Sequence, residues 1–117
     1  MHNFEKLKIW QKAMDIAVAV YDISLQLPND EKFNLIHQIK KCAVSIPSNI
    51  AEGFGRQTDK SFNHFLNISR GSLNEIETQL IIAKELEFIQ NENIFNELLF
   101  LIEEESKMIN AFSKNLK

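Results

Sequence analysis

The sequence predicts an all-α fold, an antiparallel up-down-up-down four-helix bundle in which residues 1–117 form a single domain. Two observations support this prediction. Only two prolines and three glycines occur in the chain, and nearly all of them stand where a helix could begin, end or bend. Between them, apolar residues recur at alternating steps of three and four, which places them on one helix face, and strand-like alternation is absent.

The first helix is expected from about Glu5 to Gln26, because the ring of Pro28 disfavours helical geometry in the residue before it. It carries two apolar stripes whose centres lie roughly 120° apart at about 100° per residue. One stripe consists of Leu7, Trp10, Met14, Ala17, Tyr21 and Leu25, and the other of Ile9, Ala13, Ile16, Val20, Ile23 and Leu27. This is more apolar surface than one helix seam requires.

The surplus apolar surface of the first helix predicts a second packing partner, so a homo-oligomer is expected. The residues assigned to its interface are Ile9, Ala13, Ile16, Val20 and Ile23. The alternative is a wide core face on a central helix of the same chain.

The second helix is expected to begin at Asn29 or Asp30, either of which can cap its N-terminus. It extends to about Phe54, where Gly55 suits the left-handed conformation that ends many helices. Pro47 supplies no N–H for the carbonyl one turn earlier, so a bend is expected there. The core stripe of this helix comprises Ile36, Ile39, Ala43, Ile46 and Ile50.

Thr58 is expected to cap the third helix, which extends to about Phe88. A short polar link leads into the fourth helix, from about Asn93 to Lys114. The predicted core positions are Phe62, Leu66, Ser69, Leu73, Ile76, Leu80 and Ala83, then Phe95, Leu98, Ile102, Ile109, Phe112 and Leu116. Because the connections are short, consecutive helices are expected to be antiparallel neighbours.

Two polar stripes flank the apolar seams and are the concentrated site candidates. They comprise Ser45, Asn49, Glu52 and Arg56 on the second helix, and Ser72, Glu75 and Gln79 on the third. A short turn joins these helices, so the stripes could face each other, and polar groups at a buried seam must be hydrogen-bonded. We expect a mutual network that fixes helix register, with direct ligand binding as the alternative.

Gly71 lies in the middle of the third helix, where glycine costs on the order of 1 kcal/mol relative to alanine. Close approach of another helix would explain it, and close approach of a nucleic-acid backbone is the alternative.

Composition excludes several classes of protein. No apolar run approaches the ~18 residues that a membrane span requires, so no membrane is expected. The first ten residues mix charged and apolar side chains and do not resemble a signal peptide, so a cytoplasmic location is expected. Cys42 is the only cysteine, which rules out an intrachain disulfide and a multi-cysteine metal site. The net charge of −3 is not that of a surface uniformly attractive to nucleic acid.

No catalytic, cofactor or metal site is predicted, and the protein is not expected to be an enzyme. The carboxylate that a di-iron bundle places three residues before each histidine is replaced by Asn34 before His37 and by Ser61 before His64. Cys42 and His37 do not share a helix face, which disfavours a nucleophile and base pair. The glycine-rich residues 53–56 follow a helix, whereas a phosphate-binding loop follows a strand.

The motifs together resemble a known family. They comprise Phe4, Leu7 and Trp10, residues 38–45, the segment NIAEGFGR (49–56), Phe62, Phe65 and Leu66, residues 70–72, and Glu75 with Gln79 and Leu80. They resemble the proteins encoded within intervening sequences of bacterial 23S ribosomal RNA genes, the S23 ribosomal protein family, to which the accessory variability determinant of diversity-generating retroelements is related. The resemblance covers essentially the whole chain.

The resemblance implies a four-helix protomer that assembles into a barrel-shaped homopentamer. In the retroelement branch the protein binds nucleic acid and a reverse transcriptase through a strongly basic surface, from which this acidic chain, with a sequence pI near 5.6, departs. Two functions follow as hypotheses. One is a nucleic-acid-associated module that binds RNA or DNA through Lys40, Lys41, Arg56 and Arg70, with Lys8 and Lys12 joining across an oligomer. The alternative is a structural or protein-interaction oligomer with no nucleic-acid role.

Overall fold

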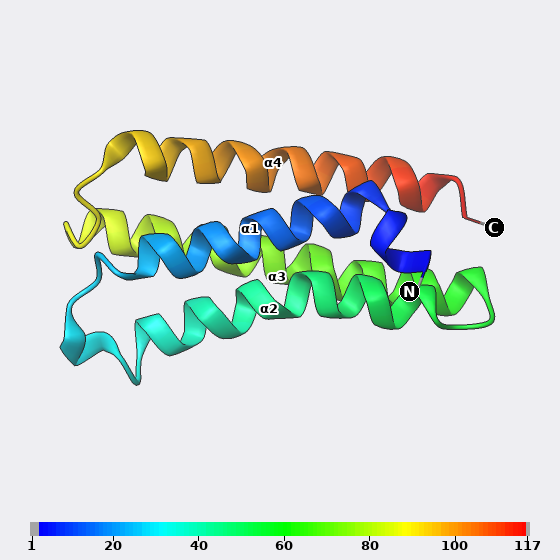
Figure 1. The fold of residues 1–117 in the computed structure, drawn as a ribbon, viewed down its shortest axis with the longest axis horizontal. Coiled ribbons are helices and arrows are strands. Elements are labelled where there is room, and N and C mark those ends of the chain that lie inside the picture. The colour runs from blue at the N-terminus through cyan, green and yellow to red at the C-terminus, as the bar shows by residue number, and fades with distance from the viewer. Residues whose placement is uncertain (1–2, 117) are drawn as a thin grey trace.

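Four long helices lie side by side in the computed structural model, which describes residues 3–116 (Figure 1). They are α1 (Lys8–Ser24), α2 (Leu35–Phe54), α3 (Asp59–Glu85) and α4 (Glu92–Lys114), with short 3-10 helices at Asn3–Lys6 (η1) and Asn29–Glu31 (η2). Each helix runs opposite to the one before it, and the bundle measures 44 × 25 × 24 Å. The predicted all-α four-helix bundle is confirmed.

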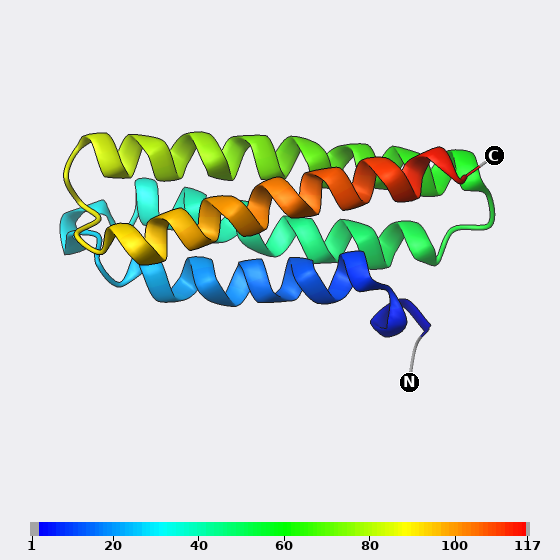
Figure 2. The same ribbon diagram turned by 90° about the horizontal axis from the view of Figure 1, so that it is seen from above.

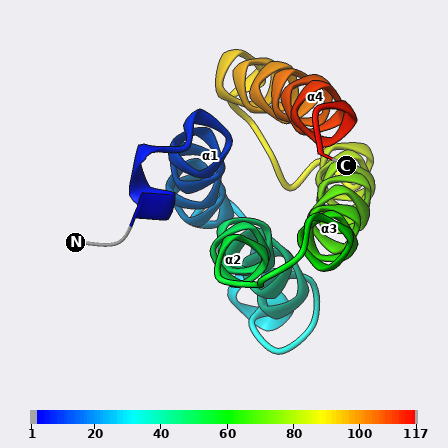
Figure 3. The same cartoon turned by 90° about the vertical axis from the view of Figure 1, so that its right-hand side faces the viewer.

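The four helices enclose one apolar core. The helix pair with the most extensive contact is α2 and α3, while α4 lies obliquely and touches both α1 and α3 (Figures 2 and 3). The large side chains with less than 2% exposure are Ile16, Ile23, Ile39, Ile46, Ile50, Leu66, Leu73, Ile76, Leu80, Leu98, Ile102 and Ile109. Burying each such side chain stabilises the fold by roughly 1.5–3 kcal/mol, so this core is the main source of stability.

Two helix N-termini are capped by side chains. Thr58 Oγ1 accepts a hydrogen bond from the Ser61 N–H at 3.1 Å, which confirms the predicted cap of α3. Asn91 Oδ1 accepts one from the Ile94 N–H at 3.1 Å and caps α4, which begins one residue earlier than expected. Each cap satisfies a backbone donor that a helix start otherwise leaves without a partner.

The predicted boundaries of the first two helices are wrong by several residues. Leu7 has an extended backbone, with φ −72° and ψ 127°, which separates η1 from α1. The predicted cap residues Asn29 and Asp30 belong to η2, and α2 begins only at Leu35. Asn34 lies between them at φ −113° and ψ −101°, outside helical geometry, so the two segments cannot form one helix.

The left-handed residue near a helix end is Glu87, not Gly55. Gly55 has φ −77° and ψ −4°, within the right-handed region, so the predicted left-handed cap is wrong. Glu87 has φ 62° and ends α3 before the expected Phe88. Its N–H donates to the Lys84 carbonyl at 3.0 Å and the next N–H donates to the Ala83 carbonyl at 2.9 Å, the two bonds of a Schellman motif.

The residues assigned to an oligomer interface are buried inside the protomer. Exposed fractions are 4% for Ile9, 1% for Ile23 and 0% for Ala13, Ile16 and Val20. That assignment is wrong because α1 contacts both α2 and α4, so this stripe fills the protomer's own core. The large exposed apolar residues of α1 are Met14, Val18 and Tyr21, and Leu25 is exposed directly after its last residue.

Two glycines in the motif region have opposite surroundings. A Cβ added at Gly53 would lie 2.8 Å from Phe65 Cβ and 2.9 Å from Phe62 Cδ1, so a side chain here would collide with α3. A Cβ added at Gly71 would meet nothing within 4 Å. Gly53 therefore permits the close approach of α2 and α3, whereas the expected close helix neighbour of Gly71 is absent within the protomer.

Replacing these two glycines is predicted to change stability in opposite directions. Gly53→Ala should lower the free energy of unfolding by roughly 1–3 kcal/mol, because the methyl group overpacks the α2–α3 contact. Gly71→Ala should raise it by roughly 0.5–1 kcal/mol through helix propensity alone. Urea denaturation followed by circular dichroism measures both, and equal stability of Gly53→Ala and wild type would contradict the packing role of Gly53.

Candidate functional site

A line of short polar side chains joins α2 to α3. Ser45 Oγ lies 2.9 Å from Ser72 Oγ, and Asn49 Nδ2 donates to Ser45 Oγ at 2.9 Å and to the Ser45 carbonyl at 2.8 Å. One turn away, Ser69 Oγ donates to the Ile46 carbonyl at 2.9 Å. We call these residues, Ser45, Asn49, Ser69 and Ser72, the α2–α3 seam. Because Ser69 and Ser72 are buried, these bonds replace the water that their hydroxyls would otherwise bind.

The seam continues through a contact that the sequence pattern did not indicate. Cys42 Sγ donates to Glu75 Oε2 at 3.5 Å. Burial, and next the charge of Glu75, raise the pKa of the Cys42 thiol. Gln79 lies beside the same thiol, and its Oε1 is buried without a hydrogen-bond partner in the described part of the chain. A thiol with a raised pKa is a weak nucleophile, so this cluster is not suited to covalent catalysis.

Glu52 and Arg56 belong to a separate surface pair. The Arg56 Nη2 and Glu52 Oε2 atoms are 3.3 Å apart, both side chains are exposed, and the guanidinium lies 4.8 Å from the centroid of the Phe65 ring. The structure therefore joins Ser45, Asn49 and Ser72 directly, reaches Glu75 and Gln79 through Cys42, and leaves Glu52 and Arg56 outside the predicted network.

Glu105 is a buried carboxyl group on α4 that the sequence analysis missed. Its side chain has 0% exposure, and neither carboxyl oxygen has a hydrogen-bond partner among the described residues. Burial raises the pKa of Glu105 from 4.5 to about 8, and the nearby charge of Lys12 opposes this shift. Lys12 Nζ donates to Glu104 at 2.6 Å, so its charge is already partnered. Glu105 is therefore mostly protonated at neutral pH.

The helical repeat could have located Glu105. The predicted core stripe of the fourth helix passed from Ile102 to Ile109 across a full heptad, and position 105 is the core position between them. From the sequence alone, an acidic residue at position 105 is expected to be exposed to solvent, because two further acids, Glu103 and Glu104, precede it. Glu105 differs from Glu103 and Glu104 in being buried, and this difference arises only when the bundle folds.

The cationic residues predicted to contact nucleic acid do not form one surface. Lys40 Nζ lies 4.8 Å from the centroid of the Tyr21 ring, on the side of the bundle formed by α1 and α2. Arg70 donates to Asn67 and to Asn110 on the side formed by α3 and α4, which lies opposite (Figure 3). Arg56 and Lys12 are paired with acids. Of the four residues predicted to contact nucleic acid, only Lys40 and Lys41 line the same surface site.

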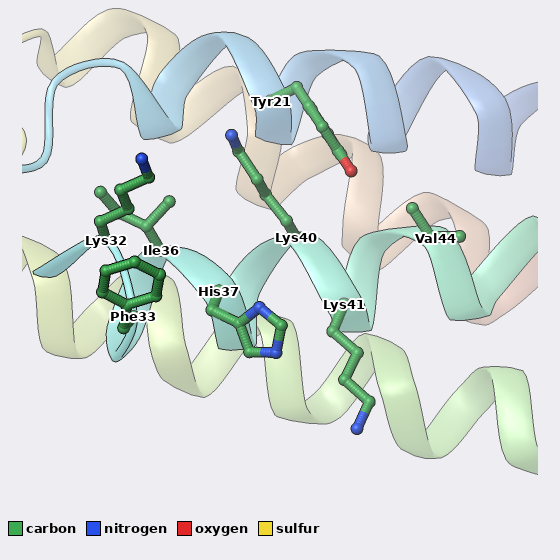
Figure 4. Close-up of a pocket in the computed structure, with 8 residues that line it drawn as sticks. All are labelled: Tyr21, Lys32, Phe33, Ile36, His37, Lys40, Lys41 and Val44. Atoms are coloured by element: carbon green, nitrogen blue, oxygen red, sulfur yellow. The ribbon is translucent and has the colours of Figure 1, made fainter.

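That site is an open groove of about 510 Å³ beside α1 and α2. We call it the α1–α2 groove. Its lining residues are Tyr21, Lys32, Phe33, Ile36, His37, Lys40, Lys41 and Val44 (Figure 4). Tyr21 comes from α1, Lys32 and Phe33 come from the segment before α2, and the remaining five come from α2. The lining contains three lysines and a histidine and no acidic residue.

Two aromatic rings of the α1–α2 groove lie beside ammonium groups. The Phe33 side chain is 85% exposed, with Lys32 Nζ 5.6 Å from its ring centroid. The Tyr21 side chain is 44% exposed beside Lys40. Phe33 was missed because the second helix was predicted to begin before it. An aromatic residue between lysine and asparagine, outside every apolar stripe, is the signal that could have indicated it.

Residues 3–116 contain neither a metal-binding cluster nor a membrane-spanning helix. Nowhere in that range do three or more histidine, cysteine, aspartate or glutamate side chains come together in a way that could hold a metal ion. None of the described helices combines the length and apolar character needed to cross a membrane.

The fold and the groove define a small four-helix-bundle protein with a cationic surface site. Residues 5–111 match the family described as 23S rRNA-intervening sequence protein, and the chain belongs to this family. This confirms the resemblance found in the sequence. A similar solved structure is a crystal structure, at 1.70 Å resolution, of a protein with unknown function from the S23 ribosomal protein family of Bacteroides thetaiotaomicron VPI-5482.

That structure aligns with a TM-score of 0.82 and 27% sequence identity, covering 92% of this chain and 99% of the other. No significant match was found among curated proteins. Neither the family description nor that of the solved structure names a reaction.

Glu105 is predicted to make stability depend on pH. Between about pH 4.5 and 8 the folded bundle retains a proton that the unfolded chain releases, so the free energy of unfolding falls as pH rises through this range and levels off above it. The slope is at most about 1.4 kcal/mol per pH unit. Urea denaturation from pH 5 to 9 measures it.

Glu105→Gln should remove most of this slope, because the amide cannot ionise. Glu103→Gln is the matched control, since Glu103 is an exposed residue of the same helix paired with Lys107, and it should keep the wild-type slope. Identical slopes in Glu105→Gln and wild type would show that Glu105 is ionised in the folded protein.

Proposed function

We propose that this protein is a non-catalytic, cytoplasmic module that binds nucleic acid through the α1–α2 groove. The observation that supports this most is the charge of the groove, in which Lys32, Lys40 and Lys41 line one surface without any acid. Phosphate groups are the ligands that such clustered lysines attract, and each lysine that neutralises a phosphate releases a counterion.

The acidic composition of the chain is compatible with this proposal. The protein has 16 acidic and 13 basic residues, which argues against binding through its whole surface. At physiological ionic strength, however, exposed charges separated by more than about 8 Å are largely screened from each other. The local charge of the groove therefore decides whether a phosphate is attracted, and the acids elsewhere restrict binding to that groove.

The surroundings of the candidate nucleophile and bases support a non-catalytic role. Cys42 is buried in the α2–α3 seam with a raised thiol pKa, while His37 lies in the α1–α2 groove. His64 is exposed, with its ring 5.5 Å from that of Phe65. Neither histidine has a hydrogen bond with Cys42 among the described residues, and the Glu75 carboxylate that does bond it raises the pKa of the thiol and so disfavours the reactive thiolate.

A homo-oligomer, and in particular a homopentamer, remains part of the proposal. Its interface would use apolar side chains that the protomer leaves exposed, in place of those first assigned. These include Met14 and Val18 on α1, Leu25 directly after it, Ile68, Ile81 and Ile82 on α3, and Phe100 on α4. An oligomer would present several α1–α2 grooves to one strand, which increases the overall affinity. Light scattering at micromolar concentration measures the mass of the assembly.

The second candidate function is a structural or protein-interaction oligomer without a nucleic-acid role. The observation that favours it is the apolar surface on α4, where the Phe100 side chain is 60% exposed beside Leu101. Such a surface fits a protein partner better than a polyanion.

The lysines of the groove are predicted to carry salt-dependent binding. A gel-shift titration with a 23S rRNA fragment should show binding at ~50 mM salt that weakens steeply at ~150 mM. The double variant Lys40→Gln with Lys41→Gln should bind more weakly and reduce the salt slope by about 1.5, because two phosphate contacts are lost.

The matched control removes the same charge from another helix, through Lys107→Gln with Lys114→Gln on α4. It should bind almost as tightly as wild type. Equal weakening by both double variants would show that net charge alone matters, and absence of binding at ~50 mM salt would reject the proposed function in favour of the second candidate.

A further inference from the structure

We propose that the α1–α2 groove takes single-stranded nucleic acid, whose unpaired bases stack on Phe33 and Tyr21. This inference rests on the proposed function and adds the class of nucleic acid. It depends on three features of the groove: the exposure of the rings, the cations beside them and the segments that supply them.

Phe33 is the most exposed large apolar side chain among the described residues, at 85%. It follows η2 and precedes Asn34, whose non-helical backbone interrupts the chain before α2. This short segment holds the ring at the surface, outside the core. A phenylalanine left in water contributes little to the stability of the protomer, so its ring face is available to a ligand.

The groove supplies a cation beside each aromatic ring. Lys32 Nζ lies 5.6 Å from the centroid of Phe33, and Lys40 Nζ lies 4.8 Å from that of Tyr21. Each ammonium lies over one face of its ring, so a base stacked on the opposite face would have its own phosphate within reach of that lysine. Alternating stacking surfaces and cations are how proteins hold a single strand without reading its sequence.

The rings belong to different segments on either side of the groove. Figure 4 shows Tyr21 reaching from α1, whereas Phe33 projects from the segment before α2. Ile36 and Val44 add apolar surface to the lining of the groove. In a duplex both faces of an interior base are already covered by its neighbours, so these rings could not stack on it. Phe33 and Tyr21 can therefore stack only on the bases of an unpaired strand.

Fluorescence anisotropy at ~50 mM salt tests the inference. The probes are a labelled 20-nucleotide RNA designed to lack secondary structure, the DNA of the same sequence, and the blunt-ended RNA duplex. Wild type should bind both single strands more tightly than the duplex and with similar affinity to each other, because the rings contact base faces and not the 2′-hydroxyl.

Phe33→Ala should weaken single-strand binding at least about fivefold and leave duplex binding unchanged, and Phe33→Trp should restore it. Tyr21→Ala should act in the same direction. Leu86→Ala is the matched control, because it removes an exposed apolar side chain, 55% accessible, at the end of α3 outside the groove. Since Phe33 lies outside the core, Phe33→Ala should keep the helical circular dichroism of wild type.

The outcomes separate this inference from the proposed function. Duplex binding as tight as single-strand binding, or no effect of Phe33→Ala on single-strand binding, would overturn the inference while the proposed function stands. Equal weakening by Leu86→Ala would also overturn it. If none of the three probes binds at ~50 mM salt, the inference and the proposed function both fail.

Discussion

The close packing of α2 against α3 is the constraint on which the rest of the bundle depends. It requires a residue without a side chain at Gly53, where Phe62 and Phe65 occupy the space that a Cβ would need. It also requires polar groups that satisfy one another, because Ser69 and Ser72 are buried in the contact. Since hydrogen bonds across a seam are made in only one alignment, the seam fixes the register of the two helices, and α1 and α4 pack against the pair.

The composition of the α1–α2 groove follows from how the chain enters α2. The interruption at Asn34 keeps η2 separate from α2, which leaves Lys32 and Phe33 on a short exposed segment. The first turns of α2 then add Lys40 and Lys41 beside the α1 residue Tyr21. A continuous second helix would have carried Phe33 on a regular face of the bundle, so a local break in helical geometry creates the composition of the groove.

Helical periodicity was sufficient to predict the fold, the core stripes and the Thr58 cap, because these depend on contacts between residues three or four apart. It also indicated that Ser45, Asn49 and Ser72 would meet. Features that depend on the surroundings of a residue were not predictable this way. Ile9, Ala13, Ile16, Val20 and Ile23 were assigned to the wrong surface because one stripe cannot show how many neighbours its helix has. The left-handed backbone of Glu87 and the burial of Glu105 arise likewise from tertiary packing.

The position of Cys42 gives the molecule a natural reporter of helix separation. Its sulfur lies between α2 and α3, hydrogen-bonded to Glu75, and Cys42 is only 8% exposed, so an alkylating reagent reacts with it mainly when the two helices part. As the chain contains no other thiol, the rate of labelling in native buffer records one specific opening event without an introduced probe. The same buried sulfur is therefore shielded from oxidants for as long as the helix pair stays closed.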